Sequence, residues 1–163
     1  MIRPVQPSEF DDALTIINEA AKAYKGVIPQ DRWREPYMPP EELKEEVKAG
    51  VNFYGYAKDQ KLVGVAGIQP VEDITLIRHT YVLPGYQRMG IGGKLLDYLI
   101  GQAETSQVLV GTWENASWAI RFYQKHGFSL VSREEKNRLL RRYWNIPPRQ
   151  VETSVVLRLT KRD

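Results

Sequence analysis

Three glycines, Gly90, Gly92 and Gly93, stand directly before a run of residues with helical spacing and after an apolar segment typical of a strand. The stretch reads GYQRMGIGGKLL, from Gly85 to Leu96. A glycine-rich turn that leads into a helix exposes backbone amides, and such amides commonly bind an anion such as a phosphate. The sequence therefore predicts an anion-binding turn, and the spacing of its residues decides which anion is favoured.

Two common phosphate-binding patterns do not fit this turn. A P-loop requires Gly-x-x-x-x-Gly-Lys-Ser/Thr, but the lysine after Gly93 is followed by Leu95, and Arg88 stands where the first glycine belongs. The dinucleotide fingerprint Gly-x-Gly-x-x-Gly fits Gly90 and Gly92 but meets Leu95 at its third glycine. A nucleotide-binding oxidoreductase is therefore disfavoured.

The pattern Gln-x-x-Gly-x-Gly is completed by Gln87, Gly90 and Gly92. Glycines lack a Cβ atom, so the backbone at these positions can come close to a phosphate. Amides at a helix start have no helical partner, and the helix dipole with the cations Arg88 and Lys94 would attract a doubly charged pyrophosphate. Without a ligand, the same glycines would simply make a tight strand-to-helix turn. Both interpretations are open from this turn alone.

A second stretch, ENASWAIRFYQKHGF, follows downstream. Asn115 opens a predicted helix that contains Phe122 and Tyr123, and Gly127 and Phe128 come directly after it. This order and the glycine turn resemble the two hallmark motifs of the GCN5-related N-acetyltransferase (GNAT) family. The tetrapeptide YVLP before the turn also matches that family. The chain is thus identified as a GNAT-like protein by two independent motifs.

The resemblance implies that acetyl-CoA is the cosubstrate and that no metal takes part. The pyrophosphate would lie on the glycine turn, and the pantetheine arm would pair with free backbone groups of the preceding strand. An amide near Val82 would hold the thioester carbonyl, on which negative charge builds during attack. The cofactor-binding residues implied in this way are Val82, Leu83, Gln87, Arg88, Met89, Gly90, Ile91, Gly92, Gly93, Lys94, Asn115 and Tyr123.

Two of these residues have a structural alternative. The resemblance implies that Tyr123 protonates the departing CoA thiolate, because a phenol with a pKa of about 10 stays protonated at neutral pH. Tyr123 would otherwise be an aromatic residue packed beside Phe122. Asn115 would hydrogen-bond the cofactor, or it would act as an ordinary helix N-cap.

The general base departs from the better-known pattern. Histone-type members of the family carry a glutamate at the position of Leu76, from which no carboxylate can act here. His79 is the nearby group suited to accept a proton at neutral pH, although a regular strand places Leu76 and His79 on opposite faces. His79 would otherwise be a satisfied core histidine, and the amine would lose its proton through water. The nearby carboxylates are Glu72, Asp73 and Glu114.

The elements that must position these residues follow from hydrophobic periodicity. Strands are expected near residues 2–6, 51–58, 61–70, 73–84, 107–113, 128–132 and 151–159, and helices after Ser8, over 41–49, after the glycine turn and over 115–126. A hairpin is expected at Asp59-Gln60, an irregular loop over 24–40, and a basic connection over 133–150. With the resemblance, this order predicts an α/β, GNAT-like fold. Its mixed, largely antiparallel sheet would have about seven strands flanked by about four to five helices.

Composition restricts the remaining possibilities. The 163 residues suit one domain spanning 1–163, with 42% hydrophobic and 26% charged residues. The absence of cysteine excludes disulfides and thiolate chemistry, and two histidines disfavour a multi-histidine metal centre. No apolar stretch approaches about 18 residues, so we expect no membrane partner and a cytoplasmic location. The 23 basic and 20 acidic residues leave an excess too small to indicate nucleic acid.

Substrate specificity is expected in the loops. Trp33, Tyr37 and the segment 141–150 would form the walls of the acceptor site, and the basic residues Arg138, Arg141 and Arg142 would favour an acidic substrate or form a solvated helix face. The sequence thus predicts an acetyl-CoA-dependent N-acetyltransferase that acts on a small-molecule or protein amine in a ternary complex. A non-catalytic acyl-CoA-binding module is the alternative, and the resemblance is compatible with a homodimer.

Overall fold

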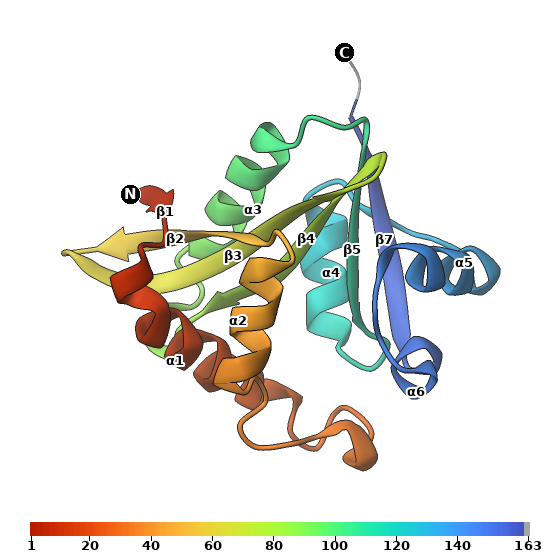
Figure 1. Ribbon diagram of the computed structural model, residues 1–163, viewed down its shortest axis with the longest axis horizontal. Coiled ribbons are helices and arrows are strands. Elements are labelled where there is room, and N and C mark those ends of the chain that lie inside the picture. The colour runs from red at the N-terminus through yellow and green to blue at the C-terminus, as the bar shows by residue number, and fades with distance from the viewer. Residues whose placement is uncertain (162–163) are drawn as a thin grey trace.

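The computed structural model describes residues 1–161 and contains one seven-stranded sheet in the order β1-β2-β3-β4-β5-β7-β6 (Figure 1). The strands are β1 (Ile2–Pro4), β2 (Asn52–Lys58), β3 (Lys61–Val71), β4 (Ile74–Val82), β5 (Gln107–Trp113), β6 (Ser129–Leu130) and β7 (Ser154–Thr160). The α-helices are α1 (Phe10–Ala21), α2 (Pro40–Lys48), α3 (Ile91–Gln102), α4 (Ser117–Lys125), α5 (Arg133–Tyr143) and α6 (Pro148–Glu152). The predicted mixed, GNAT-like sheet is confirmed, with six α-helices rather than four to five.

One strand pair in the sheet is parallel, and it opens along its length. β4 pairs with β5 through residues 75–77 and 108–110, whereas every other neighbouring pair of strands is antiparallel. β4 continues to Val82 and β5 continues to Trp113 without further pairing between them. The two strands therefore separate beyond Ile77, as the family resemblance predicts, and this opening lies in the middle of the sheet.

Both faces of the sheet are covered. Leu95, Leu96 and Leu99 of α3 belong to a core on one face, together with alternate strand residues such as Val63 and Val110. On the other face, α1 and α2 pack against residues that include Leu62 and Val65. Figure 1 shows α1 and α2 on one side of the sheet and α3 on the other. Any site at the opening between β4 and β5 is therefore reached from two separate faces.

The start of α1 differs from the sequence prediction. A 3-10 turn, Pro7–Glu9, comes before α1, so helical structure begins ahead of Ser8 and this serine makes no capping hydrogen bond. The capping contact belongs to this 3-10 turn, in which Glu9 Oε1 accepts a hydrogen bond of 2.9 Å from the amide of Gln6, the N-cap of the turn. Ser8 as the N-cap was wrong, since Pro7 fixes a helical φ one residue earlier.

The basic connection between β6 and β7 contains two helices that the sequence analysis did not assign. α5 begins after Ser132, whose hydroxyl accepts a hydrogen bond of 3.2 Å from the Glu135 amide. Buried Lys136 donates to the carbonyl of Val151 (2.7 Å) and joins α5 to α6, and burial lowers the pKa of this lysine. Because α6 occupies residues 148–152, β7 starts at Ser154 rather than at Val151.

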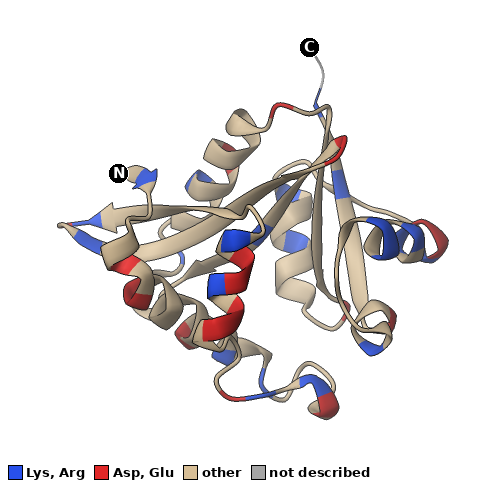
Figure 2. Cartoon of the chain, viewed as in Figure 1, with Lys and Arg blue, Asp and Glu red and all other residues tan. Residues whose placement is uncertain are grey.

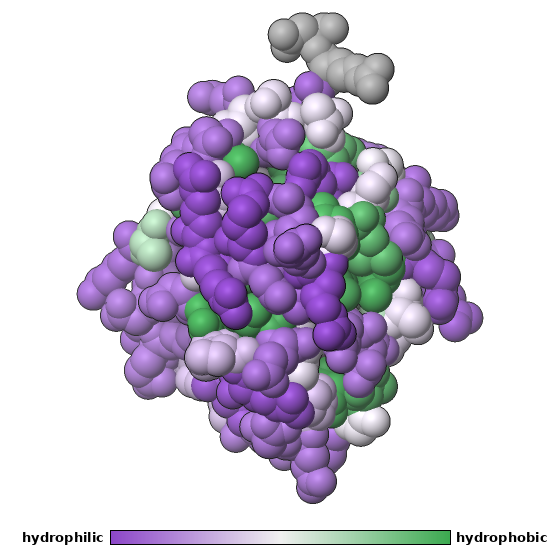
Figure 3. Space-filling view, turned by 90° about the vertical axis from the view of Figure 1, so that its right-hand side faces the viewer, coloured by the Kyte–Doolittle hydropathy of each residue, from purple (hydrophilic) through white to green (hydrophobic). Residues whose placement is uncertain are grey.

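The surface over α5 is strongly hydrophilic. Figure 2 shows basic residues concentrated on α5, and Figure 3 shows hydrophilic side chains covering much of the side of the molecule on which this helix lies. No helix within residues 1–161 has the length and apolar character needed to cross a membrane. Over the same residues, no group of three or more His, Asp or Glu side chains is arranged to hold a metal ion.

Candidate active site

The glycine turn before α3 presents a row of free amides. Arg88 and Gly90 both have left-handed backbones, with φ of +66° and +78°, and Gly90 is the N-cap of α3. Within the described residues, the first turn amide that donates to the protein is that of Lys94, which bonds to the Gly90 carbonyl at 3.0 Å. The amides of residues 88–93 have no acceptor in that part of the chain. This arrangement suits an anion placed at the helix start.

The three glycines of the turn have different surroundings. Gly90 has open space where a Cβ would lie, so its positive φ is the constraint. A Cβ at Gly92 would lie 3.6 Å from Phe122 and Val82, which is ordinary contact, so its absence leaves room for a ligand. A Cβ at Gly93 would lie 2.9 Å from the ring of His126, so close packing is the constraint there.

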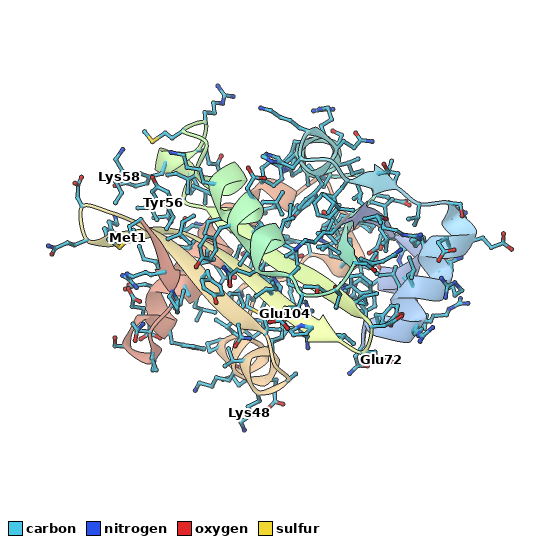
Figure 4. All side chains as sticks on the ribbon, turned by 90° about the horizontal axis from the view of Figure 1, so that it is seen from above. Met1, Lys48, Tyr56, Lys58, Glu72 and Glu104 are labelled. Atoms are coloured by element: carbon cyan, nitrogen blue, oxygen red, sulfur yellow. The ribbon has the colours of Figure 1, made fainter. Side chains whose placement is uncertain are left out.

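Positive side chains surround the turn. Arg88 and Lys94 are exposed and form no ion pair within residues 1–161, and Lys94 Nζ lies 5.9 Å from the ring centre of Tyr56. Figure 4 shows Tyr56 and Lys58 on the part of β2 near the start of α3, and Lys58 Nζ lies 3.8 Å from the sulfur of exposed Met89. Unpaired cations beside free amides are typical of a phosphate site.

Ile91 and Leu83, two of the predicted cofactor residues, have fewer groups available to a ligand than their neighbours. The side chain of Ile91 is buried in the core, so its amide alone is available to a ligand. Leu83 uses both backbone groups within the protein: its amide donates to Val63 and its carbonyl accepts from Tyr86, both at 2.9 Å. Backbone groups of successive strand residues point to alternate sides, so those of Val82 point away from β3 and toward the opening. Gln87 Nε2 donates to the Val82 carbonyl there, at 3.0 Å.

A β-bulge in β4 places His79. The pairing of β4 with β3 is irregular between Arg78 and Tyr81, and His79 has a φ of +54°. Consecutive side chains therefore point to one face: Arg78 and His79 both reach Glu46 of α2, at 3.5 Å and 2.6 Å. Because Leu76 and Arg78 share a face, the prediction that Leu76 and His79 lie on opposite faces was wrong. The ring of His79 stacks between those of Phe53 and Tyr81.

Tyr123 is buried on the other face of β4. Its ring packs edge-on against Phe122 and Phe128, at centroid distances of 5.1 Å and 5.7 Å. Burial raises the pKa of Tyr123, while the neighbouring Thr80 hydroxyl has a smaller opposite effect. Thr80 Oγ1 is itself buried without a hydrogen-bond partner of ordinary geometry in the described residues. A protonated phenol and an unsatisfied hydroxyl thus lie side by side below the opening.

Asn115 does not cap α4. The N-cap of that helix is Ala116, and Asn115 Nδ2 instead donates to the carbonyl of Val27 at 3.3 Å. The N-cap alternative was therefore wrong, because the helix begins at Ser117 and the asparagine lies outside it. Asn115 connects the end of β5 to the loop 24–40.

A cavity of about 110 Å³ lies on the face of α1 and α5, at the opening between β4 and β5. We call it the aromatic cavity. Of the residues predicted to wall the acceptor site, Tyr37 and part of the segment 141–150 border this cavity, whereas Trp33 does not line it and instead stacks on Tyr37 at 5.9 Å. Its lining residues are Tyr24, Tyr37, Ile77, Arg78, His79, Tyr81, Gly111, Thr112, Trp113, Leu140, Trp144, Ile146, Gln150 and Ser154.

The other candidate residues lie elsewhere. Glu72 and Asp73 are exposed at the β3–β4 turn, where they contact Arg142 and Tyr143 of α5. Glu114 is exposed and does not line the aromatic cavity. His126 is the C-cap of α4, and its Nδ1 lies 3.0 Å from Asp97. Three exposed arginines of α5 line an open groove away from the opening: Arg138, Arg141 and Arg142.

Sequence reasoning missed two residues of the site. Glu46 lies one helical turn after buried Leu43, which places a carboxylate on the apolar face of α2. A charged residue at such a position could have indicated a buried partner. Burial acts to raise the pKa of Glu46, but the hydrogen bond from His79 and the charges of His79 and Arg78 outweigh it and leave the pKa below its ordinary value. Thr80 carried no sequence signal, because its position follows from the bulge.

Comparisons with known proteins agree with this geometry. A family model described as an acetyltransferase (GNAT) domain matches residues 49–130. A search of curated proteins found no match. Among solved structures, the chain is similar to the PaiA N-acetyltransferase of Thermoplasma acidophilum in complex with coenzyme A, with a TM-score of 0.73, 17% identity, and coverage of 99% of this chain and 98% of that one.

Two further solved structures have the same fold. The ribosomal-protein-S18-alanine N-acetyltransferase of Escherichia coli aligns with a TM-score of 0.70 and 18% identity, over 98% of this chain and 92% of that one. A GNAT family acetyltransferase of Elizabethkingia anophelis with acetyl-CoA bound aligns with a TM-score of 0.65 and 20% identity, over 99% and 97%. The family model covers half of the sequence, and the fold matches over nearly all of it, so the chain belongs to the GNAT acetyltransferase family.

Proposed function

We propose that this protein is an N-acetyltransferase that transfers the acetyl group of acetyl-CoA to a primary amine by direct attack in a ternary complex. One observation carries the proposal. The opening between β4 and β5 has the glycine turn of α3 on one face of the sheet and the aromatic cavity on the other. An acyl donor and an amine acceptor that approach from these two faces would meet at the bulge in β4.

The residues of the glycine turn suit coenzyme A. The free amides of residues 88–93 and the unpaired cations Arg88 and Lys94 would hold the pyrophosphate, and the missing Cβ of Gly92 leaves room beside Phe122. The Val82 amide, which points into the opening, would hold the thioester carbonyl. Gln87, Met89, Gly90, Ile91, Gly93 and Asn115 complete the set of residues proposed to surround the cosubstrate, with Leu83 adjoining through its side chain.

His79 is the proposed general base. It lines the aromatic cavity, and its Nε2 is held by Glu46 at 2.6 Å. The amine arrives as an ammonium and gives one proton to His79, directly or through a water. Its nitrogen then attacks the thioester carbonyl carbon, so that a C–N bond forms, the C–S bond breaks, and the sulfur leaves with the electron pair of that bond. The nitrogen loses its second proton to water as the neutral amide forms, and the thiolate takes up a proton to leave as the thiol.

Tyr123 is the proposed donor to the leaving sulfur. Because burial raises its pKa, the phenol stays protonated at neutral pH and can donate as negative charge grows on sulfur. The raised pKa also makes it a weaker acid than an exposed tyrosine. Its hydrogen bond to the sulfur therefore strengthens in the transition state, the phenol proton passes to the departing thiolate, and the resulting tyrosinate regains a proton from solvent.

Thiol release from acetyl-CoA with a panel of primary amines tests this proposal, and mass spectrometry of the purified protein tests the cosubstrate. We expect bound CoA species and amine-dependent thiol release, with acetylated amine as the second product. Bound CoA without turnover on any amine would overturn the transferase and leave the non-catalytic acyl-CoA-binding module. Failure to bind CoA would overturn both.

A further inference from the structure

The walls of the aromatic cavity are aromatic rings that pack against one another. Tyr24 packs against Tyr37 and Tyr81 at centroid distances of 5.4 Å and 6.4 Å. Trp113 Nε1 donates a hydrogen bond of 2.8 Å to the Tyr37 hydroxyl, which ties the early loop to β5. The indole of Trp144 packs against Gly111, where a Cβ would lie 3.4 Å from the ring. A ligand in this cavity therefore meets aromatic side chains on several sides.

The side chains that line the aromatic cavity include no carboxylate. All of its lining residues lie in the described part of the chain. Arg78 and His79 are the basic residues among them, and none is Asp or Glu. Glu46 lies behind both of them and is committed to this pair. Two carboxylates of the neighbouring loop are likewise paired with cations: Asp31 with Arg149 at 2.9 Å and Glu35 with Lys25 at 3.3 Å.

This distribution of charge discriminates between amines. A first ammonium is stabilised over the faces of aromatic rings and then loses its proton to His79. A second ammonium on the same molecule would lose water at the cavity without gaining a carboxylate partner, which is costly. The aromatic cavity is thus unsuited to polyamines and aminoglycosides, although such molecules carry many primary amines.

Size restricts the acceptor further. The volume of about 110 Å³ is below the roughly 150 Å³ in which a benzene ring is held. A slender arm that carries the amine can therefore enter, while a larger body stays at the mouth. Tyr37 and Trp144 line the cavity and are half-buried, and half-buried Trp33 stacks on Tyr37. These rings offer flat surfaces on which an aromatic ring of the acceptor can stack.

We infer that the acceptor is an arylalkylamine with a single positive charge: a short aliphatic arm bearing the primary amine, attached to a flat aromatic ring. This inference rests on the proposed acetyl transfer and names the substrate class of that site. The arm lies in the aromatic cavity with its nitrogen toward His79, and the ring lies against Trp144 at the mouth.

An amine panel tests the substrate class. The purified full chain is assayed for thiol release with phenethylamine, tyramine, spermidine and kanamycin as the probes. We expect kcat/KM for the two arylethylamines to exceed that for spermidine and kanamycin by about tenfold or more, because the latter leave a charge unpaired. Equal or better turnover of spermidine or kanamycin would overturn the substrate class while leaving acetyl transfer in place. No turnover on any probe, with CoA bound, would overturn the proposed transferase itself.

A gain of function gives the sharper test. Ile146 lines the aromatic cavity and is half-buried, so Ile146→Glu places a carboxylate where the cavity has none. We expect the ratio of kcat/KM for spermidine over phenethylamine to rise by about tenfold in this variant. Ile146→Gln is the matched control with the same shape as glutamate and no charge, and we expect the ratio in the Glu variant to exceed that in the Gln variant by about tenfold. Equal ratios in the Glu and Gln variants would overturn the inference, provided both bind CoA as the wild type does.

Discussion

Glu46 Oε1 of α2 lies 2.6 Å from Nε2 of His79 in the bulge of β4, and both side chains are largely buried. The contact joins a helix of one layer to the strand at the centre of the proposed site. It fixes the ring of His79 by one nitrogen, while stacking on Phe53 and Tyr81 fixes its plane. Glu46 is therefore a positioning residue for the proposed base.

Replacing Glu46 by glutamine should lower kcat by roughly tenfold, because the ring keeps a hydrogen-bond partner but loses its counter-charge. The affinity for CoA should not change, since α2 lies on the other face of the sheet from α3. Steady-state kinetics and calorimetric titration with CoA measure the two quantities. Exposed Glu45 on the same helix offers the matched control, Glu45→Gln, which should retain the wild-type kcat. Equal kcat values for the two variants would remove Glu46 from the mechanism.

Tyr123→Phe should reduce kcat by about 100-fold with little effect on CoA affinity, because it removes the donor to the leaving sulfur and keeps the packed ring. Thermal unfolding should be measured alongside, since Tyr123 is a buried core residue. A variant that is folded, binds CoA and turns over at the wild-type rate would show that Tyr123 is only a packing residue.

Gly90→Val should abolish CoA binding, because a β-branched residue strongly disfavours the φ of +78° that aims the turn amides. Gly101→Val is a suitable control, since Gly101 lies at the far end of α3 with open space around it. Titration of both variants with CoA checks this expectation. Unchanged affinity in the Gly90 variant would exclude the turn as the pyrophosphate site.

Stability should fall in acid through Glu9. The hydrogen bond from Arg3, helped by the Gln6 amide, lowers the pKa of Glu9 to about 2. A carboxyl with a folded pKa below its unfolded value of about 4.3 contributes stability that is complete above that value and is lost as the pH falls toward about 2. The urea midpoint should therefore fall over this window.

The Glu9→Gln variant isolates that contribution, because glutamine does not titrate. Its urea midpoint should depend less on pH than that of the wild type between about pH 5 and pH 2. Glu41 is exposed and forms no ion pair in the described part of the chain, so Glu41→Gln should keep the full wild-type pH dependence. The same slope in all three proteins would contradict the role of Glu9.

Features that depend on neighbouring residues were predictable from the sequence. The hairpin at Asp59-Gln60 forms where two residues with positive φ join β2 to β3, and α3 follows the glycine turn as its periodicity indicates. The separation of β4 from β5 was implied by the family motifs. Each of these features depends on residues that are close together in the sequence, or on a family motif made of such residues.

Features that depend on pairing between distant segments were not predictable. The bulge at His79 arises from the register between β3 and β4, and it reverses the face on which the histidine lies. The partner of His79 lies 33 positions earlier in the chain, and nothing in the spacing of α2 connects the two. The many charged residues of α5 obscured its helical periodicity. Ser132 and Glu135 nevertheless have the spacing of a capping box at the start of this helix.

The stacked rings of the aromatic cavity give the protein an optical property. All four of its tryptophans lie at this cavity or against its walls: Trp113 and Trp144 line it, Trp33 stacks on Tyr37, and Trp118 stacks on Tyr24 at 5.9 Å. No tryptophan elsewhere in the chain contributes background emission. Tryptophan fluorescence therefore reports on the aromatic cavity and the rings around it, and binding of a non-fluorescent amine there can be titrated without a label.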